Sequence, residues 1–188
     1  MRKLILTQNV SLDGSPEFLT EWFTAQGQTG MDESDHIAEL RRQDSTADAL
    51  LVGRRTFLDF RGYWRDVQGD TSGISDYLNS VAKYVVSSTL TEPEWRHTTV
   101  VDGDPVAAVR QLKERDGQDI VCTGSISLSH ILLGAGLVDE LRLFTYPAVQ
   151  GRGRRLFPDG YEVERLRLLD VMSFRRGVVL TRYAVATS

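Results

Sequence analysis

The sequence predicts an α/β fold in which helices flank a mostly parallel β-sheet with an antiparallel edge. Short apolar runs of strand length alternate with segments of helical periodicity through the first two-thirds of the 188 residues. Parallel strands need crossover connections, which helices usually supply, so this alternation favours a parallel sheet. The end of the chain differs, because strand-like runs at 166–174 and 178–185 flank a turn at 175–177 and predict an antiparallel hairpin.

Six strands are expected before this hairpin. Each is a short run rich in apolar or β-branched residues, bounded by polar or glycine-containing segments. The expected strands lie at 4–7, 49–52, 83–88, 99–101, 119–122 and 137–147.

Helices are expected where start signals precede a helical period. Asp32 has the side chain of an N-cap for a helix that runs to about Arg42, with Ile37 and Leu40 facing inward. The other expected helices begin at Arg54, span 74–80, run from the N-cap Asp104 and Pro105 to Gly117, and begin at Ile126.

Three segments are expected to be loops. Residues 9–14 and 58–73 are polar, and the second of these holds Tyr63 and Trp64. Residues 15–31 mix glycine, proline and aromatic side chains, which predicts a long loop with a short helical turn. Long irregular segments in a compact domain are often lids or binding loops.

Composition indicates one soluble domain over residues 1–188. An apolar fraction of 41% with 26% charged residues is ordinary for a globular protein. The net charge of −4 argues against sequence-independent nucleic-acid binding. No stretch approaches the roughly 18 apolar residues of a membrane helix, and the single cysteine, Cys122, cannot form an internal disulfide. We therefore expect a cytoplasmic protein with no membrane partner and a buried thiol.

The strand end at Gly53 is the strongest candidate for an anion site. The apolar run 49–52 ends at Gly53, and Arg54, Arg55 and Thr56 then open a helix. A glycine permits close approach of a ligand, and helix N-termini and guanidinium groups both bind phosphate. An ordinary strand-to-helix turn with solvated arginines would have the same residues.

Two further strand ends resemble the first. Ser87 and Ser88 follow one strand, and Thr123-Gly124-Ser125 separates another from its helix. Because ligands bind at the carboxyl ends of strands in open α/β sheets, three such turns favour a nucleotide site. Serine and threonine are also plain N-caps, so no single turn is specific.

Several other chemistries find no support in the sequence. No Gly-x-Gly-x-x-Gly follows the first strand, so a Rossmann dehydrogenase is disfavoured. His36, His97 and His130 lie far apart and none has a partner at metal-ligand spacing, so no metal site is expected. The serines lack a nucleophile-elbow motif, and the basic run at 151–155 is better explained as a glycine turn.

Two carboxylates are candidate catalytic residues. Asp13 precedes Gly14 at the mouth of the first strand, where a ligand would lie, although Asp-Gly is also a common turn pair. Asp35 lies in the first turn of a helix, where its charge also suits the helix dipole.

In combination, these motifs resemble the dihydrofolate reductase superfamily, and more closely the branch related to the reductase domain of riboflavin biosynthesis. They occur in the family's order over nearly the whole chain. The motifs are Ser-Leu-Asp-Gly at 11–14, Leu-Val-Gly-Arg-Arg-Thr-Phe at 51–57, Val-Val-Ser-Ser-Thr-Leu at 85–90, Gly-Ser at 124–125, Gly-Leu-Val-Asp-Glu-Leu at 136–141 and Leu-Phe-Pro at 156–158.

The resemblance implies a three-layer α/β/α sandwich on an eight-stranded, mainly parallel sheet with an antiparallel C-terminal hairpin. It also implies NADPH as cofactor. The implied phosphate-binding residues are Gly53, Arg54, Arg55, Thr56, Ser87 and Ser88, together with Gly124, Ser125, Ile126 and Ser127 at the second helix N-terminus. Residues 12–14 would begin the loop over the nicotinamide.

The implied activity is hydride transfer to a small heterocyclic substrate, pteridine-like or pyrimidine-like, such as a 5-amino-6-ribosylaminouracil phosphate. Arg61 or Arg65 could then contact a ribose phosphate. A nucleotide-binding module that keeps the scaffold without catalysis is the alternative. Related proteins commonly form dimers, and the apolar run at 137–147 could lie at such an interface or in the core.

Overall fold

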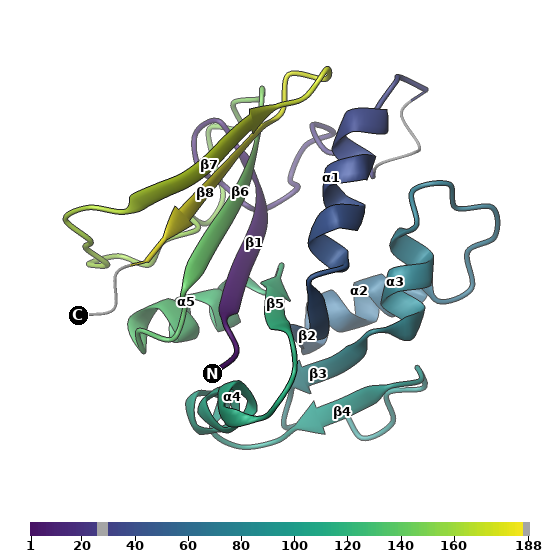
Figure 1. Cartoon of the computed structure of the whole chain (residues 1–188), viewed down its shortest axis with the longest axis vertical. Helices are drawn as coiled ribbons and strands as arrows, with labels where there is room; N and C mark the ends of the chain where they lie inside the picture. Colours follow the sequence, from purple (N-terminus) through teal and green to yellow (C-terminus); the bar gives the residue numbers. More distant parts are fainter. Residues whose placement is uncertain (26–29, 186–188) are drawn as a thin grey trace.

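Eight strands form one sheet in the computed structural model, which describes residues 1–25 and 30–185 (Figure 1). In chain order they are β1 (Leu4–Ser11), β2 (Ala47–Gly53), β3 (Ala82–Val86), β4 (Thr98–Val101), β5 (Asp119–Thr123), β6 (Glu140–Tyr146), β7 (Arg167–Ser173) and β8 (Val179–Ala184). Their order in the sheet is β4-β3-β2-β5-β1-β6-β8-β7. Strands β1 to β6 pair in parallel, and β8 is antiparallel to both neighbours, which confirms the predicted sheet.

Five helices cover the two faces of this sheet. They are α1 (Ser34–Asp44), α2 (Arg54–Trp64), α3 (Ile74–Ser80), α4 (Pro105–Glu114) and α5 (Ile126–Gly134). Figure 1 shows α1, α2 and α3 on one side of the sheet and α4 and α5 on the other. Within the described residues, no helix combines the length and the apolar character needed to cross a membrane.

Apolar clusters on the two faces hold the layers together. The cluster under α4 and α5 takes alternate residues of the central strands, such as Leu4, Leu6 and Cys122. The cluster under α2 and α3 is built from the opposite face of β2 and β3, for example Val52 and Val85. Cys122 is buried as expected, and burial raises the pKa of its thiol to about 12.

Two elements are longer than the sequence predicts. Helix α2 continues to Trp64, so the expected loop from residue 58 is wrong over its first seven residues. Phe57 and Trp64, two turns apart, are both buried on one face, while polar residues between them face outward. Strand β1 continues to Ser11, because Asn9 and Ser11 pair with β6. Residues 9–11 are therefore strand rather than loop.

Helix α1 differs from expectation at its start and on its inner face. Its N-cap is Glu33, and the carboxylate of Asp32 accepts a hydrogen bond from the amide of Ser34 at 3.0 Å. The buried residues are polar, namely His36, Glu39 and Gln43, whereas Ile37 and Leu40 are only partly buried. Glu39 on this face accepts hydrogen bonds from Arg42 and Gln43, whereas the ring nitrogens of His36 have no partner among the described residues.

The remaining differences concern the long loop and β6. Residues 15–25 contain a turn at 21–22 but no helix, and 26–29 lie outside the described residues. Strand β6 pairs with β1 on one side and β8 on the other. It is therefore an interior strand of the sheet, and an interface role for the run 137–147 stays a prediction.

Candidate functional site

Two strand ends meet at the carboxyl edge of the sheet and form a cradle of small side chains. Strands β2 and β5 are neighbours, which brings Gly53 beside Ser125. The amide of Gly53 donates to Ser125 Oγ at 2.7 Å, and the amide of Ser125 donates to Thr56 Oγ1 at 2.9 Å. The hydroxyl of Ser125 also lies 2.9 Å from Thr56 Oγ1. Three predicted site residues from two separate turns are thus in direct contact.

Gly124 completes this cradle and admits no side chain. Its φ is +58°, and a Cβ there would lie 2.7 Å from Thr56 Cγ2. The carbonyl of Gly124 accepts a hydrogen bond from Gln8 Nε2 at 2.7 Å. Gln8 is a buried residue of β1 that no sequence pattern singles out, since its role depends on the pairing of β1 with β5.

Helices α2 and α5 both begin at this cradle without a side-chain cap. Neither Gly53 nor Ser125 caps its helix through a side-chain hydrogen bond. In contrast, Asp104 caps α4 by accepting from the amide of Val106. The first amides of α2 and α5 therefore remain as donors, and helix N-termini of this kind bind anions.

The cations and hydroxyls around the cradle face solvent. Arg54 and Arg55 are exposed, and their guanidinium groups make no hydrogen bond or ion pair with the described residues. Ser88 and Ser127 are exposed as well, whereas Ile126 is buried and can offer only its backbone. The arrangement can hold phosphate groups by amides and guanidinium groups together.

Ser87 has a local role besides any contact with a ligand. Its Oγ accepts hydrogen bonds from the amides of Thr89 and Leu90 at 3.1 and 3.0 Å. These bonds shape the turn that follows β3, the strand beside β2. The hydroxyl proton of Ser87 remains available for donation.

A strip of polar side chains crosses the middle of the sheet on the face toward α1 and α2. Thr7 and Asn9 of β1 and Thr123 of β5 are partly exposed there, and Thr7 pairs with Thr123 in register. Thr7 Oγ1 has no hydrogen-bond partner within the described residues. Central parallel strands are usually continuous apolar runs, so polar residues at this place indicate a binding surface. We call Thr7, Asn9 and Thr123 the polar strip; only Thr123 was predicted from the sequence.

The family model of the RibD C-terminal domain matches residues 2–180 of the chain. The chain belongs to this family. It is 30% identical over 188 residues to the uncharacterized protein YyaP of Bacillus subtilis (strain 168), an alignment that covers 97% of this chain and 94% of that protein.

Solved structures share the fold of this RibD C-terminal domain at low sequence identity. A pyrimidine reductase-like protein from Corynebacterium diphtheriae superposes with a TM-score of 0.67 and 20% identity, covering all of this chain and 93% of that one. RibD from Acinetobacter baumannii gives 0.65 at 16% identity, covering all of this chain and 59% of that one. The predicted dihydrofolate reductase-like fold and its riboflavin-reductase branch are confirmed.

The structure assigns Asp13 to a loop contact. Its carboxylate accepts hydrogen bonds from the amides of Gln150 and Gly151 at 3.1 and 2.7 Å. A hydrogen bond from Ser11 and these two amides lower its pKa to about 2. These hydrogen bonds favour the ionised carboxylate of Asp13, and its catalytic role stays a prediction.

Asp35 is likewise an ionised acceptor. Its carboxylate accepts from the amide of Arg175, in the turn between β7 and β8, at 3.0 Å, and that bond is the main reason why its pKa lies below the ordinary value. The structure does not bring Asp35 into contact with the cradle residues. As with Asp13, its observed role is to fasten a loop.

Arg61 and Arg65 do not reach the site. Helix α2 begins at the carboxyl edge of the sheet, so its later turns lie about 10–15 Å along the helix axis from that edge. Arg61 donates to Glu94, and Arg65 donates to Asp66 and to the carbonyl of Glu94. Both side chains thus have acceptors on or beside the helix, and their contact with a ribose phosphate stays a prediction.

Proposed function

We propose that this protein is an NADPH-dependent reductase of the riboflavin-biosynthesis type that acts on a small heterocyclic compound. The family membership supports a reductase of this type. The observation that carries the proposal is the cradle of Gly53, Thr56, Gly124 and Ser125 between two uncapped helix N-termini. Such a cradle fits the pyrophosphate of a dinucleotide.

The residues around the cradle fit the phosphates of NADPH in charge and in shape. Amides at the start of α2 and α5 would hold the pyrophosphate, and no Cβ at Gly124 obstructs its approach. Arg54, Arg55 and the hydroxyls after β3 would hold the 2′-phosphate by charge-assisted hydrogen bonds. When bound, NADPH supplies the hydride.

The polar strip is the surface that we assign to the substrate. The partly exposed amide of Asn9 and hydroxyl of Thr123 can bind the donors and acceptors on the edge of a flat ring. A pteridine-like or pyrimidine-like compound, such as a 5-amino-6-ribosylaminouracil phosphate, has such an edge. The name of the pyrimidine reductase-like relative from C. diphtheriae is consistent with this class.

Three ionisable groups, Asp13, Asp35 and His36, are poorly suited to donate a proton at neutral pH. Asp13 and Asp35 are ionised at neutral pH, and His36 is buried with a pKa lowered mainly by burial to about 4. A proton for the reduced product would therefore come from water that reaches the partly exposed polar strip. The chain's own contribution is to bind and orient the two reactants.

The lack of a suitable proton donor at Asp13, Asp35 or His36 supports a second candidate function. A scaffold that binds the nucleotide without an ionisable proton donor at Asp13, Asp35 or His36 could act as a binding module. Tight NADPH binding with no consumption of NADPH on any pteridine or pyrimidine substrate would favour that function over a reductase.

Titration with NADPH and NADH tests the cofactor assignment. Arg54→Ala and Arg55→Ala should each weaken NADPH binding by roughly tenfold or more, because a charge-assisted phosphate contact contributes about 1.5–3 kcal/mol. Binding can be followed by the quenching of tryptophan fluorescence. Arg61→Ala is the matched control, since it lies on the same helix but pairs with Glu94.

Absorbance assays on a panel of pteridines and phosphoribosylaminopyrimidines then test turnover. The cofactor assignment fails if NADPH does not bind, or if both arginine variants bind it as well as the Arg61→Ala control. A protein that binds NADPH and reduces a member of the panel would establish the reductase.

A further inference from the structure

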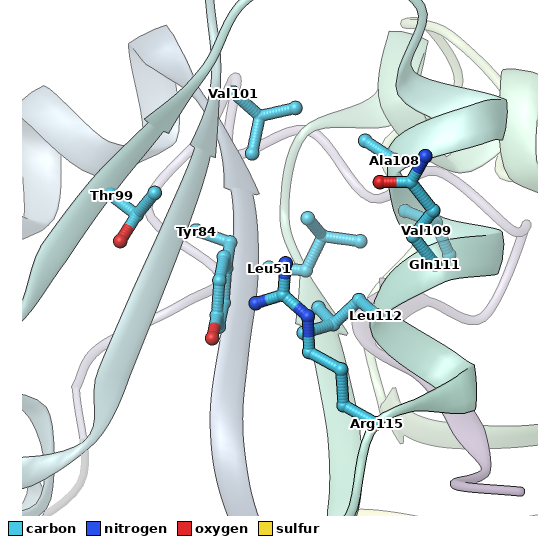
Figure 2. Close-up of a pocket in the computed structure, with 9 residues that line it drawn as sticks. All are labelled: Leu51, Tyr84, Thr99, Val101, Ala108, Val109, Gln111, Leu112 and Arg115. Carbon is cyan, nitrogen blue, oxygen red and sulfur yellow. The ribbon is translucent and has the colours of Figure 1, made fainter.

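A hollow of about 150 Å³ lies on the other face of the sheet, between α4 and the strands β3 and β4 (Figure 2). None of the cradle residues or polar-strip residues lines it. Protein interiors are close-packed and contain few voids larger than a water molecule. A hollow of this size is as large as an apolar cavity known to accept a benzene ring.

Small and apolar side chains create the hollow. Its floor is formed by Leu51 of β2 and by Val109 and Leu112 of α4, all of which are buried. Ala108 lies on the α4 side, where its methyl group leaves space that a larger residue would fill. The floor can make apolar contacts with a ligand. Each methylene-sized group of the ligand that it buries makes the binding free energy more favourable.

The walls hold one aromatic ring and one cation, besides Thr99, Val101 and Gln111. The ring of Tyr84 stands on β3 along one side, and Figure 2 shows the Arg115 guanidinium pointing into the space between Tyr84 and Leu51. Arg115 is the only charged residue among the described residues that line the hollow. Its guanidinium makes no hydrogen bond or ion pair with any other described residue. A planar guanidinium without a partner is well suited to a carboxylate.

We propose that this hollow binds a small, flat monoanion of the aromatic carboxylate class. The ring of the ligand lies on Leu51, Val109 and Leu112 beside Tyr84, and its carboxylate binds Arg115. The site is separate from the cradle, so this proposal does not depend on the proposed reductase function.

Benzoate is the probe for this site, and benzamide is its neutral counterpart. In heteronuclear NMR spectra of the full chain, millimolar benzoate should shift the amides of Tyr84, Val109 and Leu112. Benzamide should bind roughly tenfold more weakly, because it lacks the charge-assisted contact. Arg115→Gln should weaken benzoate by a similar factor and leave benzamide unchanged.

Three further variants make the test specific. Arg110→Gln, an exposed position on the same helix outside the hollow, should bind benzoate like the wild type. Ala108→Leu should fill the hollow and abolish binding of both probes. If leucine at this position disturbs folding, Ala108→Val serves in its place and should weaken binding of both probes. NADPH affinity should stay unchanged in all of them. The proposal is overturned if benzoate shifts none of the three amides, or if Arg115→Gln binds it as tightly as Arg110→Gln.

Discussion

Gly124 occupies a position where both its conformation and its surroundings exclude a side chain. The backbone has a φ of +58°, and a Cβ would contact Thr56 Cγ2 at 2.7 Å. Gly124→Ala should therefore destabilise the protein by about 1–3 kcal/mol and weaken NADPH binding, because Thr56 must move out of the cradle. Gly134→Ala is the control, since nothing lies within 4 Å of a Cβ there. Thermal unfolding and NADPH titration of both variants measure the effect; equal behaviour would contradict it.

His36 makes the stability of the fold sensitive to acid. It is 1% exposed and stacks against the rings of Phe144 and Phe174. Burial is the main cause that lowers its pKa from 6.5 to about 4. Arg176 lowers the pKa further, whereas Glu33, Asp35 and Glu39 raise it. Neither ring nitrogen has a hydrogen-bond partner among the described residues.

The sign of the effect follows from the depressed pKa. The unfolded chain binds a proton below pH 6.5 and the folded chain only near pH 4, so stability is lost as the pH falls through this window. His36→Phe keeps the ring contacts but cannot bind a proton. Between pH 7 and pH 5 the variant should therefore lose about 2 kcal/mol less stability than the wild type. Denaturant unfolding at both pH values measures this, with His130→Ala as control. An unchanged pH dependence in His36→Phe would exclude His36 as the cause.

Gln150 joins two segments at the carboxyl edge of the sheet, residues 12–23 and 147–154. Its Oε1 accepts from the amide of Leu19 at 3.0 Å and from Trp22 Nε1 at 2.9 Å. Its Nε2 donates to Ser15 Oγ at 3.0 Å. The carboxylate of Asp13 adds two hydrogen bonds between the same segments, because it accepts from the amides of Gln150 and Gly151.

Removal of Gln150 should loosen the 12–23 segment alone. With hydrogen bonds of about 1 kcal/mol each, Gln150→Ala should raise amide hydrogen exchange in this segment by roughly tenfold or more. The central strands should exchange as before. Gln118→Ala, which removes an exposed glutamine outside this contact, is the control. Exchange measured by mass spectrometry decides the question, and equal rates in both variants would show that Gln150 does not hold the segment.

Among the elements, those with strong local signals were predicted well and those with long-range partners were not. Helix α4 begins at Asp104 as expected, because its cap and Pro105 act locally. The extension of β1 through Asn9 required the pairing with β6, which no local pattern reveals. The buried polar face of α1 likewise depends on partners elsewhere, such as Arg142, whose side chain approaches Gln43.

At the scale of the whole molecule, β7 exposes apolar side chains along an open edge of the sheet. Leu168 is 54% and Val171 57% exposed. One side of β7 has no neighbouring strand in the sheet, so its backbone groups there can pair with another strand. We propose that a second copy pairs with it in antiparallel register, which would place Arg167 of one copy opposite Asp170 of the other and form two symmetric ion pairs.

Light scattering after size exclusion measures this assembly. The wild type should be a dimer, and Val171→Lys should convert it to a monomer by placing a charge at the centre of the interface. Val149→Lys adds the same charge at an exposed loop position and should leave the dimer intact. A wild-type monomer at high concentration would contradict the proposal.

The sequence by itself determined the order of strands and helices along the chain. It also determined the two glycine turns of the cradle and the resemblance to the reductase family. These features are encoded locally, in hydrophobic period, helix start signals and glycine positions. Only the tertiary structure decided that Gly53, Thr56 and Ser125 touch, that Asp13 and Asp35 serve loops, and that the polar strip and the hollow exist. The reason is physical, because each depends on which strands and loops lie side by side, and that pairing joins residues far apart in the chain.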